Sequence, residues 1–410
     1  MTRRDGERVA SRAEQALFGD DVPVVAPRDT AALAESLRDA VAQGVRIRPA
    51  GLGAHPAESD PVEAPRVVSV AAFDRIVAHS PDDFTVGVEA GVPLATLRAE
   101  LARHGQEVPA DLPATGTIGG WVARGAVSPR QGRHGPLASL VLGVEGVRTS
   151  GETFRSGGMV VKNVAGYALH KFLVGSRGTS AVLTRVNLRL RQLPETRTLG
   201  FLRGAATELD EATEKLATSG LEPVLFRLEG AAAATLPDER GPGSAVAFLF
   251  EGNRTRVAWQ IEQAHSVLPN PGAVTRATDD DAAAWLDRLV AFGEPPENPR
   301  ADVGVFRLSV PAAETLRAAH GAATAIEARE GLAHVAADPM TGLITIRQED
   351  ERRLDQSLAA LRNVATRHRG FVRAISVPPA VHAGLGRVAT AGHELRERVR
   401  RVFDPGSVLS

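Results

Sequence analysis

The 410-residue sequence contains no cysteine. This absence excludes disulfides, thiolate metal sites, cysteine-ligated iron–sulfur clusters and a cysteine nucleophile, and it is compatible with either redox compartment. No apolar run approaches the roughly 20 residues that a membrane helix needs, and the opening residues lack the apolar stretch of a signal peptide. We therefore expect a cytoplasmic chain without a transmembrane segment.

The net charge of the sequence is small, and aromatic residues are few. The net charge is -1, no basic block occurs, and only 4% of the residues are aromatic. The sequence offers neither a basic footprint nor a stacking platform, so nucleic acid is not expected as a partner. The apolar fraction of 43% predicts a folded chain, and one domain per roughly 100 to 200 residues predicts two or three domains.

Lysine and tyrosine are nearly absent. The lysines are Lys162, Lys171 and Lys215, and the single tyrosine, Tyr167, lies between the first two. In a sequence so rich in arginine, a lysine points to a place where a compact, strongly hydrated ammonium is needed. Chance placement stays open as an explanation, because Lys215 falls on an ordinary predicted helix.

The first half of the sequence has an α+β pattern. Residues 27–49 predict a helix, with Leu33, Leu37 and Val41 on one face and Gly44 at its end, followed by a strand. A second helix is predicted over residues 93–104. The clearest strand begins at Val182, where alternation predicts one buried and one solvated face. Further strands are predicted at VVSV, FTVGVEAG, LVLGVEGVRT and ETFRSGG.

Pro194 ends the Val182 strand, and we place a domain boundary near residue 195. Beyond it the pattern predicts helices packed on an antiparallel sheet. The predicted strands are AVAFLFEG, VGVFRLSV, LITIRQ and GFVRAISV, and the predicted helices lie at 254–267, 311–320, 350–368 and, in the arginine-rich tail, 393–402.

A first glycine-rich element, Gly51-Leu52-Gly53, directly follows a predicted strand. Glycine permits close backbone approach, so its amides are suited to surround a phosphate. Two prolines in the next segment, AHPAESDP, prevent the helix that a Rossmann fingerprint or a P-loop requires, and we reject both folds. Taken alone, the element is equally well an ordinary turn.

Two more elements follow in order. Thr117-Ile118-Gly119-Gly120 combines a hydroxyl with two glycines and is suited to placing amides against a second oxyanion, with a packed turn as the alternative. The third element runs from KNVAGY, residues 162–167, to GSRGT, residues 175–179, which leads into the Val182 strand.

These three elements in this order resemble the vanillyl-alcohol-oxidase, or PCMH, type of FAD-binding domain, and within it the family of FAD-binding subunits of bacterial glycolate oxidase. The tail RVRRVFDPGSVL resembles the closing helix and Asp-Pro turn of that family. The resemblance implies an α+β fold: an N-terminal extension (1–19), a two-subdomain FAD-binding domain (20–195), an α+β cap domain with an antiparallel sheet (196–380), and a helix and tail that return to the FAD domain (381–410).

The resemblance also implies which residues hold FAD. The first loop and the Thr-Ile-Gly-Gly element would hold the diphosphate, KNVAGY is the most specific match, and the backbone at Val182 would meet the flavin or adenine edge. The implied cofactor-binding residues are Gly51, Leu52, Gly53, Ala54, His55, Thr117, Ile118, Gly119, Gly120, Lys162, Asn163, Gly166, Tyr167 and Val182. A histidine that links flavin covalently in relatives aligns with Gly53 here, so we expect noncovalent FAD, with His55 either a polar neighbour of the diphosphate or a loop histidine.

Three positions depart from the family pattern. Ala54 replaces a serine or threonine, which removes a hydroxyl contact worth about 1 to 3 kcal/mol if it is made to a charged group. Ala181 adds a methyl group to a glycine position, and Gly116 replaces an alanine. All three lie on segments that the resemblance assigns to the cofactor.

No catalytic apparatus is evident, and the catalytic residues stay unknown. Catalytic relatives carry clustered histidines and a carboxylate that bind a metal in the second domain, whereas the histidines here are scattered, so no metal site is expected. Four arginines on predicted strands are candidates for a substrate carboxylate, although a solvated sheet face is the simpler interpretation. They are Arg227, Arg307, Arg347 and Arg373.

The leading hypothesis is an FAD-binding oxidoreductase subunit that takes part in oxidation of a small 2-hydroxy acid such as glycolate or D-lactate. It would pass electrons to partners, which the resemblance implies are a second flavoprotein subunit and an iron–sulfur subunit, since a chain without cysteine holds no such cluster itself. The alternative is a non-catalytic structural subunit with weakened or lost FAD binding. A stand-alone flavin oxidase ranks third.

Overall fold

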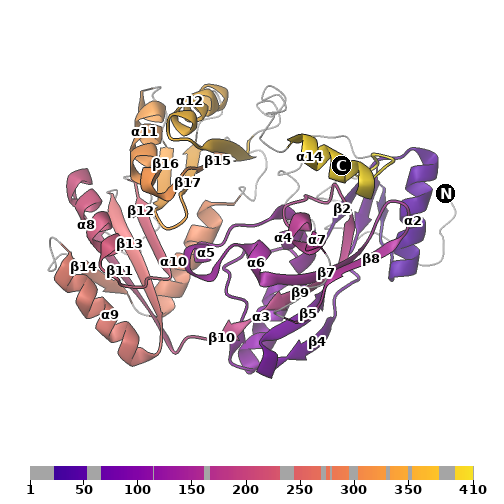
Figure 1. Cartoon of the computed structure of the whole chain (residues 1–410), viewed down its shortest axis with the longest axis horizontal. Helices are drawn as coiled ribbons and strands as arrows, with labels where there is room; N and C mark the ends of the chain where they lie inside the picture. The colour runs from indigo at the N-terminus through magenta and orange to yellow at the C-terminus, as the bar shows by residue number, and fades with distance from the viewer. Residues whose placement is uncertain are drawn as a thin grey trace. The chain divides into compact units, whose positions relative to one another are not determined.

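The computed structural model of the chain describes residues 23–52, 66–113, 115–160, 167–230, 244–268, 274–277, 279–294, 303–328, 333–349, 353–377 and 393–409. The chain divides into two compact units (Figure 1). Unit 1 comprises Met1–Val127, Gly135–Leu193 and Arg387–Ser410, and unit 2 comprises Ser128–His134 and Pro194–Gly386. The short segment Ser128–His134 thus belongs to unit 2, although the sequence places it inside the first domain.

Unit 1 alternates short helices and strands. Its strands are β1 (Val24–Val25), β2 (Ile47–Ala50), β3 (Arg66–Ser69), β4 (Ile76–Ser80), β5 (Thr85–Glu89), β6 (Gln106–Glu107), β7 (Val141–Val147), β8 (Thr153–Gly157), β9 (Val182–Arg189) and β10 (Arg191–Gln192). Its helices are α2 (Thr30–Gln43), α3 (Leu94–Arg103), α4 (Ile118–Arg124), α6 (Leu137–Leu140), α7 (Leu169–Leu173) and α14 (His393–Phe403), with a 3₁₀ turn η2 at Pro81–Asp83.

Two main sheets organise unit 1. A parallel sheet has the order β1-β3-β2, and an antiparallel sheet has the order β4-β5-β9-β7-β8. β6 and β10 form a separate antiparallel pair. One apolar core joins α2, α3 and α4 to both main sheets. The mixture of helices and sheets confirms the α+β class, and the division of this domain into two subdomains stays a prediction.

Helix α2 begins and ends at residues that favour helix ends. The side chain of Asp29 accepts a hydrogen bond from Ala32 N at 2.8 Å, and Gly44 ends the helix with a φ of 62°. Leu33 and Leu37 are fully buried, as predicted. Val41 is 39% exposed, so its predicted place on the buried face is wrong, because the apolar stripe has rotated away from the core after three turns.

The predicted solvated face of the Val182 strand is wrong in part. Arg185 and Arg189 are half-buried, but Leu183 and Asn187 on the same face are 6% and 2% exposed. β9 is central, paired with β5 on one side and β7 on the other, so neighbouring side chains cover both of its faces. The guanidinium of Arg185 also lies close to Gly87, where an added Cβ would sit 2.7 Å from Nη2.

Unit 2 is built from longer elements. Its strands are β11 (Thr196–Arg203), β12 (Leu225–Glu229), β13 (Ala245–Gly252), β14 (Val274–Ala277), β15 (Val303–Ser309), β16 (Ala333–Asp338), β17 (Leu343–Glu349) and β18 (Phe371–Ser376). Its helices are α5 (Gln131–His134), α8 (Ala206–Thr218), α9 (Arg254–Val267), α10 (Asp279–Phe292), α11 (Thr315–Glu327) and α12 (Leu354–Arg367), with a 3₁₀ turn η4 at Ala312–Glu314.

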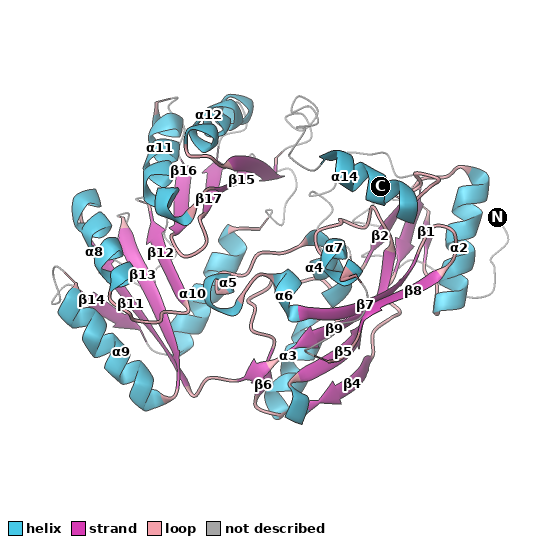
Figure 2. Ribbon diagram, viewed as in Figure 1, coloured by secondary structure: helices cyan, strands magenta, loops and turns pink. Residues whose placement is uncertain are grey.

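One eight-stranded antiparallel sheet, in the order β14-β11-β13-β12-β16-β17-β15-β18, forms the centre of unit 2. Helices α8, α9, α11 and α12 pack on one face through a large apolar core, and α10 packs on the other face (Figure 2). The predicted antiparallel sheet with packed helices is confirmed. Across the described residues of both units, no helix is long and apolar enough to cross a membrane.

Candidate functional site

The first glycine element begins where β2 ends. Gly51 and Leu52 are described, and Leu52 is 44% exposed, whereas Gly53, Ala54 and His55 lie outside the described residues. A Cβ added at Gly51 would sit 2.3 Å from Thr117 Oγ1. The end of β2 therefore lies directly against the second glycine element, and only glycine fits there without displacing Thr117.

The second element forms the N-terminus of α4. Thr117 is the N-cap, and the first three amides of the helix already donate hydrogen bonds within the chain. Ile118 donates to Val92 O at 3.0 Å, Gly119 to Ala90 O at 2.7 Å and Gly120 to Thr117 Oγ1 at 3.2 Å. The amides expected to face an oxyanion are therefore engaged within the chain.

The segment before α4 and the first turn of α4 present backbone without side chains to a ligand. Gly120 is exposed and Gly116 is half-buried, and Thr115 next to it presents an exposed side chain. Gly116 has a φ of 95°, a conformation that glycine adopts readily and alanine does not. The departure at Gly116 therefore has a local conformational reason. The sequence reasoning did not single out Thr115, although it lies within the glycine-rich stretch ATGTIGG.

The third element packs on the other end of α4. Gly175 N donates to Val122 O at 3.0 Å, and Arg177 N donates to Ala123 O at 2.7 Å. A Cβ added at Gly178, whose φ is 75°, would sit 3.3 Å from Pro49 on β2. The structure thus brings the described parts of all three glycine elements together around α4 and the end of β2.

The turn that receives the α4 amides is itself fixed by an ion pair. Glu89, at the end of β5, accepts hydrogen bonds from Arg75 N at 3.0 Å and from the Arg75 guanidinium at 2.7 and 3.2 Å. Burial raises the pKa of the Glu89 carboxyl, but the hydrogen bonds and charge of Arg75 outweigh it and hold the pKa below its ordinary value. The carboxylate is thus ionised and keeps the following residues, including Ala90, in place.

Of the KNVAGY motif, the structure describes the last residue, Tyr167. Lys162, Asn163 and Gly166 lie outside the described residues, and Tyr167 is 92% exposed. Lys171, the second rare lysine, is exposed on α7. The side chain of Tyr167 is therefore fully available to a ligand or a partner, and it plays no part in the described core.

A buried histidine anchors the helix that follows this motif. Ser156 Oγ on β8 accepts a hydrogen bond from His170 N at 3.0 Å and lies 3.1 Å from His170 Nδ1. The Ser156 hydroxyl thus contacts both the backbone amide and the ring of His170 and ties the start of α7 to β8. Burial, and to a lesser extent the charge of Lys171, lowers the pKa of His170 below its ordinary value.

Val182 begins β9 and is 1% exposed. It pairs with Val147 on β7, whereas the β5 register on the other side ends at Arg185, after which Ala90 N donates to Thr184 O. Among the described strands, none pairs with Val182 on that second side. The side chain of Val182 belongs to the core, and the contact of its backbone with the flavin or adenine stays a prediction.

Arg227, Arg307 and Arg347, which are candidate arginines of unit 2, make contacts that hold the structure of that unit. Nη2 of Arg307 donates to Gly293 O at 3.2 Å and Nη1 of Arg347 to Glu294 O at 3.3 Å, so both hold carbonyls at the C-terminal end of α10. Arg227 Nε lies 3.1 Å from Glu229 Oε1, and both side chains are buried. Arg373 is exposed on the edge strand β18.

The described residues contain no group of three or more histidine, aspartate or glutamate side chains arranged to hold a metal ion. Burial lowers the pKa of Arg347, an effect that does not remove its charge in the physiological range. Arginines that hold carbonyls and buried carboxylates serve the architecture of the sheet. A substrate-binding set is therefore not assembled by these four residues.

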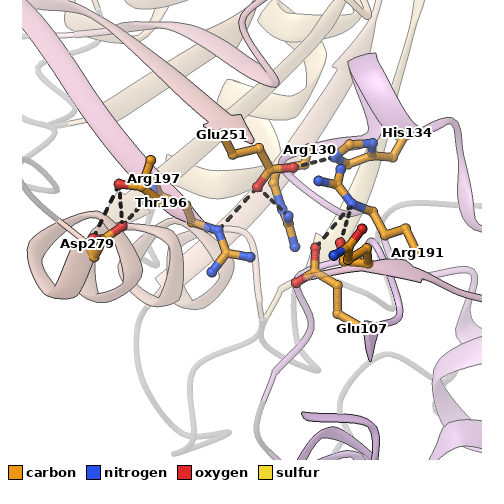
Figure 3. Close-up of polar contacts among 9 residues, drawn as sticks. Glu107, Arg130, His134, Arg191, Thr196, Arg197, Glu251 and Asp279 are labelled. Carbon is orange, nitrogen blue, oxygen red and sulfur yellow. Dashed lines mark hydrogen bonds and ion pairs between the residues drawn. The ribbon is translucent and has the colours of Figure 1, made fainter. Parts of the chain in front are cut away.

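The most buried charge cluster of unit 2 is centred on Glu251, at the end of β13 (Figure 3). Arg130 Nη1 donates to Oε2 at 2.8 Å, Arg197 Nε donates to the same oxygen at 3.1 Å, and His134 Nε2 lies 2.8 Å from Oε1. The Glu251 side chain is 0% exposed and that of Arg130 is 2% exposed. This cluster fixes the segment Ser128–His134 in unit 2, and sequence reasoning missed it.

Comparison with known proteins identifies the domain that carries the glycine elements. Residues 23–167 match the family model described as an FAD binding domain. Glycolate oxidase subunit GlcE of Escherichia coli is 33% identical over 222 residues, which are 52% of this chain and 63% of the relative. Glycolate oxidase subunit GlcD of Bacillus subtilis is 29% identical over 283 residues, 64% of this chain and 59% of the relative.

A third relative, D-lactate dehydrogenase of Archaeoglobus fulgidus, is 40% identical over 102 residues, 25% of this chain and 23% of the relative. The matched parts therefore span less than two thirds of each of these three relatives. A solved structure of alkyldihydroxyacetonephosphate synthase superposes with a TM-score of 0.70 at 14% identity, covering 94% of this chain and 76% of that chain. That likeness extends the shared fold across both units.

Proposed function

We propose that this chain, whose residues 23–167 form an FAD-binding domain of the PCMH type, is the FAD-binding subunit of a complex that oxidises a small 2-hydroxy acid. FAD would bind noncovalently in unit 1. The relatives named as glycolate oxidase subunits and as D-lactate dehydrogenase support a substrate of the glycolate or D-lactate type.

The observation that carries the proposal is the meeting of the glycine elements in unit 1. Gly51 abuts Thr117, Gly178 lies beside β2, and the half-buried Gly116 and exposed Gly120 have no side chain to keep a charged ligand from the backbone. These residues fit the diphosphate of FAD, and the groups that can donate hydrogen bonds to it are as follows. The α4 amides are engaged, so the amide contacts would fall to the first loop, and the exposed hydroxyl of Thr115 would supply a donor before α4.

When bound, the flavin would supply the chemistry of a two-electron carrier, taking up the electrons that are released with two protons when the complex oxidises a 2-hydroxy acid to a 2-keto acid. The chain's own residues bind and orient the cofactor. On the side away from β7, where none of the described strands pairs with Val182, its backbone edge would meet the flavin or adenine ring. His170 keeps α7, and with it the exposed Tyr167, attached to β8.

Partner subunits follow from what the chain does not provide. A chain without cysteine ligates no iron–sulfur cluster, and the part of unit 2 that is described brings no metal-binding group together. We infer that a second flavoprotein subunit carries out the substrate chemistry and that an iron–sulfur subunit accepts the electrons. The location expected for such a complex subunit is the cytoplasm.

A non-catalytic structural subunit is the second candidate function. Two observations favour it: the α4 amides are satisfied without a ligand, and Arg227, Arg307 and Arg347 are committed to structural partners. Under this alternative the chain retains the fold, binds FAD weakly or not at all, and holds its partners together.

The visible spectrum of the purified chain separates the two candidates. The chain is incubated with FAD and desalted, and glycolate or D-lactate is then added without oxygen, first to the chain alone and then together with a catalytic partner subunit. Retained flavin that is bleached only in the complex supports the proposal. A chain that stays colourless after desalting overturns it in favour of the structural subunit.

A further inference from the structure

The C-terminal tail, residues 404–409, is held by one buried carboxylate. Asp404 follows α14 and is fully buried. Its Oδ1 accepts a hydrogen bond from Val408 N at 3.1 Å, and its Oδ2 accepts one from Leu409 N at 2.9 Å. Ser407 N closes the turn onto Asp404 O at 3.1 Å. The carboxylate therefore orients both backbone amides and forces the tail to turn back after the helix.

The turned tail lies along the edge of the sheet that carries the first glycine element. β2 is the last strand in the order β1-β3-β2, so one of its edges has no named strand beside it. Ile47 N donates to Val408 O at 2.8 Å, and Leu409 pairs in parallel with Ile47. Arg400 Nη2 also donates to Leu409 O at 2.9 Å. The tail thus pairs with β2 at Ile47, the first residue of the strand, on the edge opposite β3.

β2 leads straight to the candidate FAD site. Gly51, which abuts Thr117, follows Ile47 by four residues, about 13 Å along an extended strand. β3 holds the other side of β2, with Val70 N donating to Ala50 O at 2.8 Å. With β3 paired along one edge and the tail fixed to Ile47 on the other, the strand delivers Gly51 to one position. An unpaired edge would leave β2 and the start of the first loop less ordered.

We infer that Asp404 is a positioning residue for the FAD site, acting through the tail and β2 on Gly51. The inference rests on the proposed function. Asp404 touches neither cofactor nor substrate; it lowers the conformational freedom of the strand that presents the first loop. When the tail detaches, the binding-competent arrangement of the loop becomes a fraction of the population, and the apparent FAD dissociation constant rises by the inverse of that fraction.

The test measures FAD binding to the purified full chain and to three variants by quenching of flavin fluorescence, well below each melting temperature. Asp404→Ala removes both acceptors, and we expect the dissociation constant to rise about tenfold or more, the result of a competent fraction near one tenth. Asp404→Asn keeps one acceptor, so its dissociation constant should lie between those of the original chain and Asp404→Ala. Thr149→Val is the matched control, because Thr149 Oγ1 donates to Phe403 O at 3.4 Å and holds α14 without reaching the paired residues.

Hydrogen exchange of the unmutated chain supplies a readout that needs no variant to fold. Because coupling is reciprocal, FAD should slow amide exchange in the peptide 404–409 and in the peptide that contains Ile47. Unchanged exchange in both peptides with FAD bound, or an Asp404→Ala dissociation constant within twofold of the original chain, overturns the inference. A chain that binds no FAD at all instead refutes the proposed function, so the two failures are distinguishable.

Discussion

Replacing Glu251 by glutamine should cost unit 2 a large part of its stability. The substitution keeps the size of the side chain but removes the charge that Arg130 and Arg197 face. The guanidinium of Arg130, only 2% exposed, would then be buried without its counter-ion. Removing one partner of a buried ion pair typically costs about 3 to 5 kcal/mol, a large share of the roughly 5 to 15 kcal/mol that keeps a domain folded.

The same segment provides a matched control. Arg133 Nη2 lies 2.8 Å from Glu222 Oε2, and Arg256 pairs with the same carboxylate, but all three side chains are 41% to 56% exposed. Exposed pairs contribute about 0 to 1 kcal/mol, so Glu222→Gln should leave the free energy of unfolding nearly unchanged. The two substitutions make the same chemical change at carboxylates that each pair with two arginines, and they differ in burial.

Urea unfolding followed by tryptophan fluorescence gives both values. In a Trp121→Phe background the remaining tryptophans, Trp259 and Trp285, belong to unit 2, and Trp285 is fully buried in its core. Glu251→Gln should shift the midpoint strongly to lower urea, with the slope unchanged. Equal, small losses for Glu251→Gln and Glu222→Gln would refute the assignment of a stabilising role to burial of this cluster.

Gly51→Ala should raise the FAD dissociation constant about tenfold or more, equal to about 1.4 kcal/mol, because the new Cβ would meet Thr117 Oγ1 at 2.3 Å. Gly44→Ala is the control, because its Cβ would meet nothing within 4 Å. It should lower the stability of the chain and leave FAD binding unchanged. Since the pKa of His170 is lower in the folded chain, the unfolded chain binds the proton more readily, and stability should fall as the pH drops below about 6.5. Urea midpoints from pH 7 to 5 should show a weaker pH dependence in His170→Gln, and an identical slope in the two proteins would contradict the account. Lys162→Arg and Tyr167→Phe should each weaken FAD binding in fluorescence titrations. Tyr167→Phe should leave the melting temperature unchanged, because the Tyr167 side chain is 92% exposed. If both variants bind FAD and assemble as the original chain does, the clustering of the rare lysines and the tyrosine is coincidence.

Local signals in the sequence predicted the elements that position the site. Asp29 and Gly44 at the ends of α2, and the glycines of the three elements, act through the conformation of a few neighbouring residues. The order of the glycine elements then gave the fold class by resemblance. Helix α10 escaped notice, although three aspartates in its first turn and Trp285, Leu286 and Leu289 on its buried face are a readable signal.

Contacts between residues far apart in the sequence could not be predicted from these signals. Arg130 and Glu251 are 121 residues apart, and nothing in the local pattern of either one indicates the other. The amides of α4 read as free donors in the sequence, but the carbonyls that accept from two of them, in the turn after β5, become neighbours only in the folded chain. For the same reason Asn187 was predicted to be solvated, since the strands that cover it pair only in the tertiary structure.

Unit 1 is proposed to hold FAD without a covalent bond. The most direct measurement is the flavin content of the purified, FAD-incubated and desalted chain before and after denaturation, with Gly51→Ala alongside. The account predicts flavin in equal amount to the chain, released completely into the filtrate on denaturation and largely lost from Gly51→Ala. A chain without flavin, or flavin that stays attached to the denatured polypeptide, would contradict it.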